Sequence, residues 1–520
     1  MSNTDKFTPI IGKNVIENLT VGMYDDPRFV YREYVQNAAD QIDIAKKQKI
    51  YQSDSEPSIY IQIDNEKKKI VIEDNATGIK QAEVLPLLGN IAQSTKNKYE
   101  DKGFRGIGRL GGLGYCEKLT FETSYFGENK KSVMTWDAKR LKELFNDVDV
   151  KNDAAEIISI ITDYSFNNND DANSHYFKVT MENVTSEVLL DAQQVREYLS
   201  MVAPVPFANT FTFKNKIYEN AKAKGVIIDE YNIYVNTDQL FKGYKDYIYN
   251  NKAVSTEDTI VEVNFFEESY NDSLLFWGWY GISKVMHQIP DENKERGIRL
   301  RKSNIQIGLE NRLDEFHKKE LGNRYFIGEI YAINKELIPN GRRDFFLDNE
   351  ECTQLTRKLR EAFNRIYTVY YDFSTKNSAI NNSQKLEENK KLIKDTTLDD
   401  QKKKKITTEI ERLEKKVADA KNFIPRILNK YKEKDSVIYS VLDESIKESG
   451  FDFTPEQKDN TPSKVVLNKP QTVQQLIATP QTLSSQEENV LKKVYAILRT
   501  NLIKSTAEEL IQKIEEEFNK

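Results

Sequence analysis

The chain has 520 residues, which is enough for two or three domains. Because 38% of its residues are hydrophobic and 30% are charged, we expect part of the chain to be solvated helix. Its formal net charge of −6 does not favour non-specific binding to nucleic acid, because proteins of that kind are normally basic overall. The two cysteines are too few for a disulfide framework or a zinc site. The sequence has neither the pattern of a signal peptide nor an apolar stretch long enough for a transmembrane helix. We therefore expect a cytoplasmic protein without a membrane segment.

The first 205 residues alternate the patterns of helices and strands. A helix is expected over 27–48, with Pro27 in its first turn. Residues 59–75 alternate apolar and polar side chains around a polar turn, which predicts a β-hairpin. Two further strands and a helix are expected at 118–126, 175–184 and 190–202.

A second mixed region spans residues 210–370. Its patterns predict four strands and a final helix, at 260–267, 274–283, 297–308, 325–333 and 350–369. The composition then becomes strongly charged, and apolar residues alternate at spacings of four and three: Ile406, Ile410, Leu413, Val417, Ala420 and Ile424. This heptad seam predicts either a coiled coil between chains or a helical hairpin within one chain. Residues 453–485 have the composition of a linker, and 485–518 form an amphipathic helical segment.

The expected helix over 27–48 carries the first candidate chemistry. Glu33, Asn37 and Asp40 in REYVQNAAD are spaced by four and three residues, so they share one helix face. A carboxylate there can take the proton of an attacking water, and an amide oxygen one turn away can bind Mg²⁺. Taken alone, the pattern also fits the solvated face of an amphipathic helix.

The second motif is IVIEDNATGI, residues 70–79. A β-rich run ends in Asp74, whose carboxylate can accept a hydrogen bond from an exocyclic amine such as that of adenine. Gly78 allows the backbone to turn and to approach a ring closely. The same residue types also occur at an ordinary exit from a strand into a loop.

The third motif is GFRGIGRLGGLGYC, residues 103–116, in which Gly103, Gly106 and Gly108 form a G-x-x-G-x-G pattern. The backbone N–H groups of such a segment can surround phosphate oxygens. Flexible loops share this composition, so a glycine pattern is weak when it stands alone.

In this order and at these separations, the three motifs resemble the GHKL superfamily of ATPases, in particular its branch of ninety-kilodalton heat-shock chaperones. LLGNIAQSTK is similar to the entry of that branch's lid, and YLSMVAPVPF to the exit from its ATPase domain. GFRG is also similar to the MutL branch. The resemblance covers about the first 205 residues well and implies an α/β fold (an α+β sandwich), with a GHKL ATPase domain over 1–208 and a transducer-like α/β middle domain over 209–370. Beyond about residue 370 no chaperone domain is recognised. There the composition predicts a charged helical or coiled-coil segment over 371–430 and a helical C-terminal region over 431–520.

By matching position, the resemblance implies ATP and Mg²⁺ as ligands. Glu33 takes the role of the general base, Asn37 that of the Mg²⁺ ligand, and Asp40 supports the pocket from the same helix face. Asp74 holds the adenine amine, and Gly78 lines the base pocket.

The implied lid also contacts the nucleotide. Its candidate residues are Ser94, Gly103, Gly106 and Gly108, which close over the phosphates. The chain departs from the chaperone pattern at two places. Gln93 stands where the related lid has lysine, and Ser174-His175 stand where it has a Gly-Thr pair near the adenine, so Ser174 is the candidate for the missing hydroxyl.

The segment IPNGRRDFF, residues 338–346, is similar to the chaperone's middle-domain loop, which carries an arginine to the γ-phosphate. Alignment on Asn340 and Asp344 makes Arg343 the candidate, with Arg342 as its neighbouring alternative. A guanidinium can stabilise the charge on transferred phosphate oxygens. A surface turn with a basic pair is the simpler interpretation of the same residues.

These residues predict an ATPase that works as a conformational switch. ATP closes the lid, the second domain supplies an arginine, and hydrolysis resets the state. The expected result is the remodelling or clamping of a protein partner by a homodimer, which the seam and the 485–518 segment would hold together.

Three other functions fit parts of the sequence. A histidine kinase shares the ATP fold, but His175, His287 and His317 all lie outside the helical hairpin that a phosphoacceptor needs. A MutL-like or gyrase-like DNA clamp, including one in an antiphage defence system, agrees with GFRG, although the acidic balance does not favour nucleic acid. A module that only binds nucleotide is disfavoured by the presence of Glu33.

Overall fold

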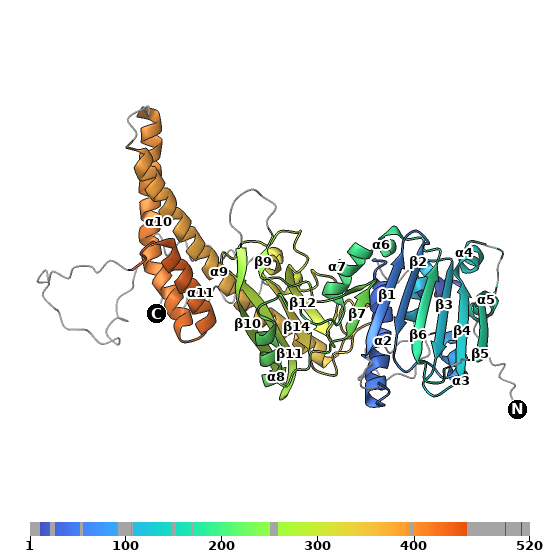
Figure 1. Ribbon diagram of the computed structural model, residues 1–520. Helices are drawn as coiled ribbons and strands as arrows, with labels where there is room; N and C mark the ends of the chain where they lie inside the picture. Colours follow the sequence, from blue (N-terminus) through green and yellow to red (C-terminus); the bar gives the residue numbers. More distant parts are fainter. Residues whose placement is uncertain are drawn as a thin grey trace, which may run out of the picture. The chain divides into compact units, whose positions relative to one another are not determined.

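The computed structural model (Figure 1) describes residues 11–20, 26–51, 56–91, 106, 108–147, 149, 152–168, 171–249, 258–394, 400–454, 495 and 511. The chain divides into two compact units, Met1–Pro455 and Glu456–Lys520. The elements described below belong to the first unit. The expected amphipathic segment over 485–518 and most of the expected linker lie outside the described residues.

An eight-stranded sheet in the order β5-β4-β3-β6-β2-β1-β7-β8 forms the first layer. Only β1 and β7 pair in parallel among these neighbours in the described part of the chain. The strands are β1 (Ser58–Asp64), β2 (Lys69–Asp74), β3 (Lys118–Ser124), β4 (Lys130–Asp137), β5 (Thr162–Asn168), β6 (Tyr176–Glu182), β7 (Asn232–Val235) and β8 (Asp238–Gln239). Because β7 and β8 join this sheet, it extends past the expected domain end at 208.

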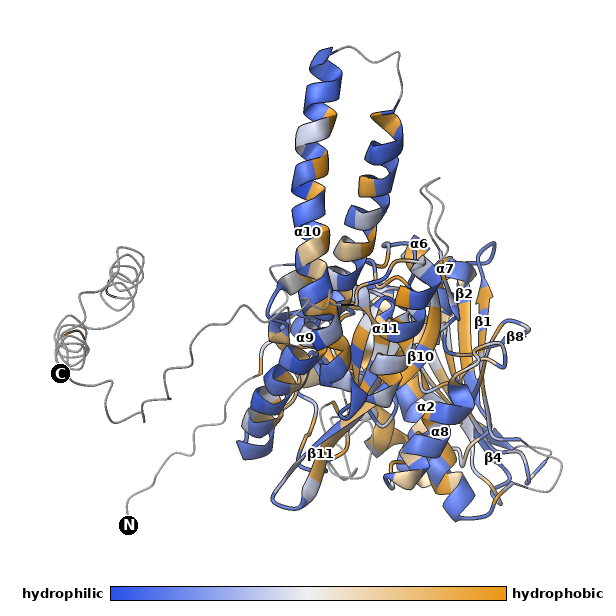
Figure 2. Cartoon of the chain, turned by 90° about the vertical axis from the view of Figure 1, so that its left-hand side faces the viewer, coloured by the Kyte–Doolittle hydropathy of each residue, from blue (hydrophilic) through white to orange (hydrophobic). Residues whose placement is uncertain are grey.

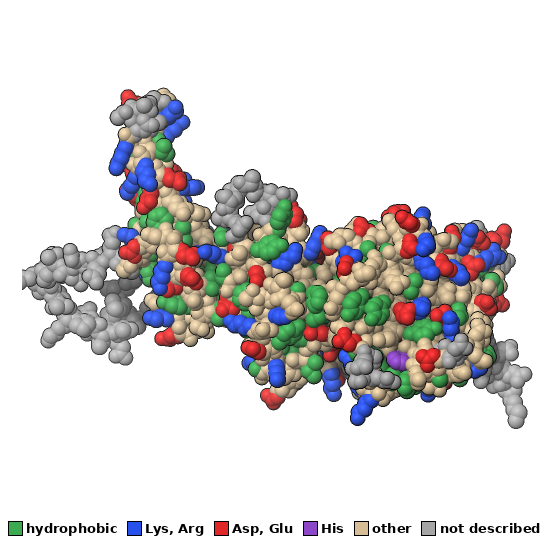
Figure 3. Space-filling model, in the orientation of Figure 1, with side chains coloured by type: hydrophobic (Ala, Val, Ile, Leu, Met, Phe, Trp, Pro, Cys, Tyr) green, Lys and Arg blue, Asp and Glu red, His purple; other side chains and the backbone are tan. Residues whose placement is uncertain are grey.

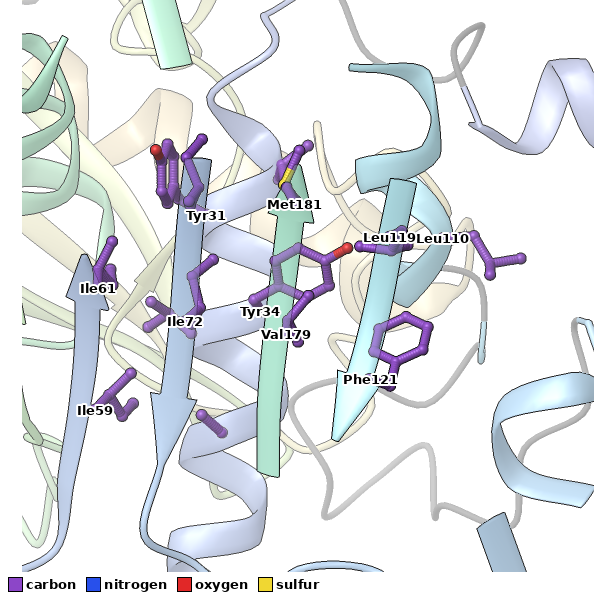
Figure 4. Close-up of a cluster of buried hydrophobic side chains, with 14 of the residues drawn as sticks. Tyr31, Tyr34, Ile59, Ile61, Ile72, Leu110, Leu119, Phe121, Val179 and Met181 are labelled. Carbon is purple, nitrogen blue, oxygen red and sulfur yellow. The ribbon is translucent and has the colours of Figure 1, made fainter. Parts of the chain in front are cut away.

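Helix α2 (Phe29–Lys47) packs against one face of this sheet. Tyr31 and Tyr34 lie against the inward-facing side chains of the strands (Figure 4). In β2, Ile70, Ile72 and Asp74 are the buried positions, because successive side chains of a strand point to opposite faces. The alternation therefore places the Asp74 carboxylate on the face that α2 covers.

The remaining helices of this region are short. They are α1 (Asn14–Thr20), α3 (Gln81–Val84), the π-helical turn η1 (Leu85–Gly89), the 3₁₀ segment η2 (Gly108–Gly114), α4 (Ala138–Asn146), α5 (Ala154–Ile161), α6 (Glu187–Leu190) and α7 (Ala192–Val202). Asp153 and Glu156 form a capping box at the start of α5, and the Asp191 side chain caps α7.

A second, six-stranded sheet has the order β13-β12-β14-β11-β10-β9. Trp277 and Trp279 of β11 pack toward Ile217 of α8 (Lys214–Ala223), whereas Phe276 and Tyr280 pack toward α9 (Glu350–Leu392). The sheet is therefore buried on both faces. Its strands are β9 (Tyr247–Ile248), β10 (Asp258–Tyr270), β11 (Ser273–Ser283), β12 (Gly297–Lys302), β13 (Ile305–Gln306) and β14 (Ile327–Ala332), and the 3₁₀ turns η3 (Asp314–Phe316) and η4 (Glu320–Tyr325) precede β14.

Three charged side chains form a fully buried cluster beside this second sheet: Arg301 of β12, Glu329 of β14, and Lys242, which follows β8. Lys242 donates to Glu329 Oε1 at 2.8 Å, and the Arg301 guanidinium pairs with the same carboxylate. Arg301 also donates to the carbonyl oxygen of Met201, in α7. Pairing of this kind offsets the cost of removing charges from water, and it ties the end of α7 to the second sheet.

The heptad seam packs within the chain. Helix α9 continues to Leu392, well beyond the expected end at 369, and α10 (Asp400–Lys432) runs beside it (Figures 1 and 2). Leu413, Ala420 and Ile424 are buried at this contact, and Lys390 of α9 forms an ion pair with Glu414 of α10 at 2.7 Å. The seam therefore takes the second form that the sequence allowed, a helical hairpin, and α11 (Ser436–Ser449) follows it.

Most expected helices and strands are present in the described residues, with ends shifted by a few positions. Helix α9 is longer than expected. The single strand expected over 297–308 is wrong, because Ser303 and Asn304 have positive φ values and turn the chain between two antiparallel strands, β12 and β13. The structure confirms the mixed α/β fold with helical elements toward the C-terminal end. None of the described helices is long and apolar enough to cross a membrane. The expected four-part domain division stays a prediction.

Candidate functional site

The three candidate residues of α2 do not lie on a solvated face. Glu33 is 7% exposed and Asp40 is 3% exposed, while Asn37 is half-buried. Carboxylates are rarely buried without partners, because removing a charge from water costs several kcal/mol. The burial therefore separates this helix from an ordinary amphipathic surface helix, the simpler alternative in the sequence.

Glu33 has a cationic neighbour that sequence reasoning missed. Arg32 Nη2 donates to Glu33 Oε1 at 3.3 Å, and both side chains are 9% exposed. The two residues are adjacent in the sequence, but nothing in their spacing indicates that both side chains turn to the same side. The guanidinium therefore holds the carboxylate in place.

The glycine-rich segment packs directly on α2. A methyl group at Gly108 would overlap the Glu33 carboxylate, and methyl groups at Gly111 and Gly112 would overlap the Phe29 ring and the Tyr34 hydroxyl. These glycines therefore permit a close approach of η2 to the helix, which a merely flexible loop does not require. Tyr34 donates to the carbonyl oxygen of Arg109 at 2.8 Å and fixes the same contact.

Burial also shifts two ionisable groups at this contact. It lowers the pKa of the Arg109 guanidinium to about 10, so the side chain stays cationic at neutral pH. It raises the pKa of the Tyr34 hydroxyl, which therefore stays protonated and can donate. Gly106 has a φ of 69°, a conformation that glycine adopts without strain. Gly103, Ser94 and Gln93 lie outside the described residues.

The loop after β2 requires glycine at position 78. Gly78 has a φ of 68°, and a methyl group there would overlap the Ser124 carbonyl oxygen. Asp74 is 3% exposed, and its Oδ1 accepts a hydrogen bond from the Ala76 backbone N–H at 3.0 Å. Both observations agree with a rigid loop on which a flat ring could lie.

Two contacts tie this loop to neighbouring elements. Thr77 Oγ1 donates to Gln41 Oε1 of α2 at 2.8 Å. His175 Nδ1 lies 2.7 Å from the Ala76 carbonyl oxygen, to which the Nδ1–H tautomer donates, and its ring meets the edges of Tyr51 and Phe126. Sequence reasoning missed Gln41 and His175, although the departure from the Gly-Thr pair pointed at the second position. The half-buried Ser174 lies beside this contact.

The 338–346 segment forms a tight turn on the second sheet. Pro339 and Phe346 form a bridge, and the Arg343 N–H donates to the Asn340 carbonyl oxygen at 3.2 Å. Arg343 is 7% exposed and has a φ of 57°, whereas Arg342 is exposed. A positive φ is uncommon for a residue other than glycine and is often retained at functional sites.

A cleft of about 1090 Å³ lies between the helices α2 and α7 on one side and residues 294–344 of the second region on the other. Arg28, Phe29 and Arg32 line it from the start of α2, and α7 contributes Tyr198. The turn of the second region lines it from the other side, with Arg342, Arg343 and Asp344. The structure therefore brings Arg343 into the same cleft as Arg32, the residue that contacts Glu33.

Residues 29–172 match the family described as histidine kinase-, DNA gyrase B- and HSP90-like ATPase. The chain is 27% identical over 159 residues to the chaperone protein HtpG of Psychrobacter cryohalolentis, which covers 26% of this chain and 24% of that relative. It is 31% identical over 163 residues to HtpG of Buchnera aphidicola subsp. Cinara cedri, covering 28% and 25%. The chain thus spans about a quarter of the length of these curated relatives.

The matched region contains α2, the loop after β2 and η2. In its fold and its family match, this region is similar to ATPase domains of the GHKL type.

Proposed function

We propose that this chain binds ATP at the junction of α2, the loop after β2 and η2, and that it hydrolyses the nucleotide. The observation that carries the proposal is the meeting of three motifs that lie far apart in the sequence. Gly108 packs on Glu33, and Thr77 bonds to Gln41 one residue after Asp40. All three motifs therefore surround one face of α2.

The loop after β2 is suited to the adenine. Its buried carboxylate, Asp74, can accept the exocyclic amine, and Gly78 lets the loop backbone approach the Ser124 carbonyl oxygen closely. His175 and Gln41 hold the loop in place from either side. Ser174 is retained as a candidate contact of the base.

The α2 face is suited to the phosphates. Glu33 acts as the general base for the attacking water, and Arg32 orients its carboxylate. Asn37 offers an amide oxygen to Mg²⁺, which would neutralise phosphate charge when bound. Asp40 supports this face, and the lid residues Ser94, Gly103, Gly106 and Gly108 close over the phosphates.

Arg343 completes the site from the second sheet. Both Arg342 and Arg343 line the cleft that Arg32 lines, and they differ in burial: the Arg343 side chain is largely buried, whereas Arg342 is exposed. A guanidinium that approaches the γ-phosphate would couple hydrolysis to the position of the second sheet. The resulting cycle is an ATP-driven switch that remodels or clamps a protein partner, in a homodimer joined through the C-terminal segment. The HtpG relatives are named as chaperones, which agrees with this output.

The nucleotide preference tests the proposal. Asp74 accepts a hydrogen bond from adenine, whereas guanine presents a carbonyl oxygen at the same ring position and would face the carboxylate unfavourably. We expect calorimetry to show ATP binding well ahead of GTP. Asp74→Asn should weaken ATP binding by about tenfold to a hundredfold, because hydrogen bonds to charged groups contribute about 1.5–3 kcal/mol. Unchanged ATP affinity in a folded Asp74→Asn variant would remove this residue from the site.

A further inference from the structure

The projecting part of α9 and α10 concentrates the positive charge of the chain. The helical arm comprises the described residues 376–394 and 400–432. The sequence from 376 to 432 contains sixteen lysine and arginine residues and nine aspartate and glutamate residues, a formal charge of +7. The whole chain is at −6, so the rest of it carries −13. An acidic protein therefore presents one strongly basic element.

Lysines cluster at the end of the arm. Residues 385–405 contain eight lysines and no arginine or aromatic residue, and all eight lysines belong to the described stretches 385–394 and 400–405. Most of these lysines are exposed: Lys385, Lys390, Lys391, Lys394, Lys402, Lys404 and Lys405. Figure 3 shows basic side chains along the projecting helices. Lysine is a flexible point charge that suits phosphate contacts without sequence reading.

The outer surface of the arm offers little apolar area to a protein or a lipid. Leu413, Ala420 and Ile424 face α9 and are at most 2% exposed. Among the described residues of the arm, Leu392 is the large hydrophobic side chain that is exposed, at 50%. Protein interfaces have an apolar core, and helices that lie on membranes need an apolar face. Hydrophilic residues dominate both helices there (Figure 2).

We propose that the end of the helical arm binds the phosphate backbone of a nucleic acid duplex. Binding of this kind needs only positive charge on a surface that can lie along the backbone. Single strands are usually held by stacking of bases on aromatic side chains, and 385–405 has none. The proposal does not depend on the ATP site, because it rests on residues of another element.

Fluorescence anisotropy with a labelled duplex DNA of about thirty base pairs tests the proposal over a series of salt concentrations. Lys402, Lys404 and Lys405 are exposed positions of one helix end, and glutamine preserves helix propensity there. For the full-length triple Lys→Gln variant, we expect the salt slope of log K to become shallower by about 0.9 per lost contact. Affinity should fall by on the order of a hundredfold at about 0.1 M salt.

A second triple variant controls for total charge. Lys47, Lys139 and Lys222 are exposed on α2, α4 and α8, so their replacement by glutamine removes the same charge elsewhere. This variant should bind duplex nearly as well as the wild-type chain, and circular dichroism should show equal helix content in both variants. Equal losses in both variants, or an unchanged arm variant, would overturn the proposal.

The same assay with other probes identifies the source of the phosphate and the class of partner. Duplex RNA and duplex DNA share the backbone chemistry, and their relative affinities show which is preferred. Single-stranded DNA of the same length should bind more weakly. Equal or stronger arm-dependent binding to phosphatidylserine vesicles or to polyglutamate would contradict the assignment to nucleic acid.

Discussion

Arg343→Ala is the variant that most sharply separates the proposed coupling from a merely structural turn. Alanine keeps a Cβ atom and so faces the same positive φ of 57° as arginine, whereas glycine would also relieve strain and mix two effects. The loop's backbone bonds, from Arg343 N–H to Asn340 and from Gly308 N–H to Arg343, can all remain. The perturbation is therefore confined to the side chain beyond Cβ.

The expected magnitude follows from the loss of a charge-assisted hydrogen bond to phosphate. Such a bond contributes about 1.5–3 kcal/mol, so steady-state turnover should fall by roughly tenfold to a hundredfold. ATP affinity should stay nearly constant, since the contact would form mainly in the closed state. Phosphate release and calorimetric ATP titration measure the two quantities on the same preparation.

Arg342→Ala is the matched control, because Arg342 belongs to the same turn, carries the same charge and is exposed. It should leave turnover within about twofold of the wild-type value, as surface substitutions usually have small effects. Arg343→Lys keeps the charge but loses the planar fork and should recover only part of the rate. Wild-type turnover in Arg343→Ala would refute the coupling, as would an equal loss in both alanine variants.

Two further predictions concern assembly and stability. Truncation after Pro455 should give a monomer that still binds ATP, because Leu413, Ala420 and Ile424 of the seam are buried inside the chain and we expect the 456–520 segment to join two copies; light scattering that finds a full-length monomer would contradict this. Burial lowers the pKa of His317 to about 4, below the ordinary value of 6.5. As the pH falls, the unfolded chain therefore binds a proton at this residue before the folded chain does. The free energy of unfolding should decrease between about pH 6.5 and 4. This loss should reach about 3 kcal/mol in denaturant titrations and be absent in His317→Leu, and an identical pH slope in the variant would show that His317 is not its source.

The sequence predicts an element best where its pattern of apolar and polar residues matches the face that the folded chain buries. Alternation located β1 and β2, and the register of β2 carried Asp74 inward beside Ile70 and Ile72. The edge strand β5 was not expected, since TDYSFNN has a mostly exposed and polar surface and thus no apolar face to reveal it. Helical structure was expected over 371–430, but the continuity of α9 through residue 369 was not. Its polar end is stabilised by packing on α10, which a single-helix pattern does not show.

For the candidate site too, the sequence predicts what a local pattern determines and not the contacts between distant side chains. The spacing of Glu33, Asn37 and Asp40 predicts one helix face, and the structure places them there. The contact of Arg32 with Glu33 depends on the rotamers of two neighbouring side chains. The contact of His175 with Ala76 joins residues that are far apart in the sequence. No pattern in one sequence encodes those directions, so only the folded chain shows them.

Comparison of ATP binding and hydrolysis in Glu33→Ala tests the central claim most directly. The substitution removes the proposed base, its bond to Arg32 and the packing of Gly108 on the carboxylate. It leaves Asp74 and the contacts of Gly111 and Gly112 with α2 in place. We expect calorimetry to give nearly wild-type ATP affinity. Single-turnover hydrolysis should be slower by about 10²–10⁴-fold, the usual contribution of a general base. Wild-type hydrolysis in this variant, with ATP bound, would contradict the account.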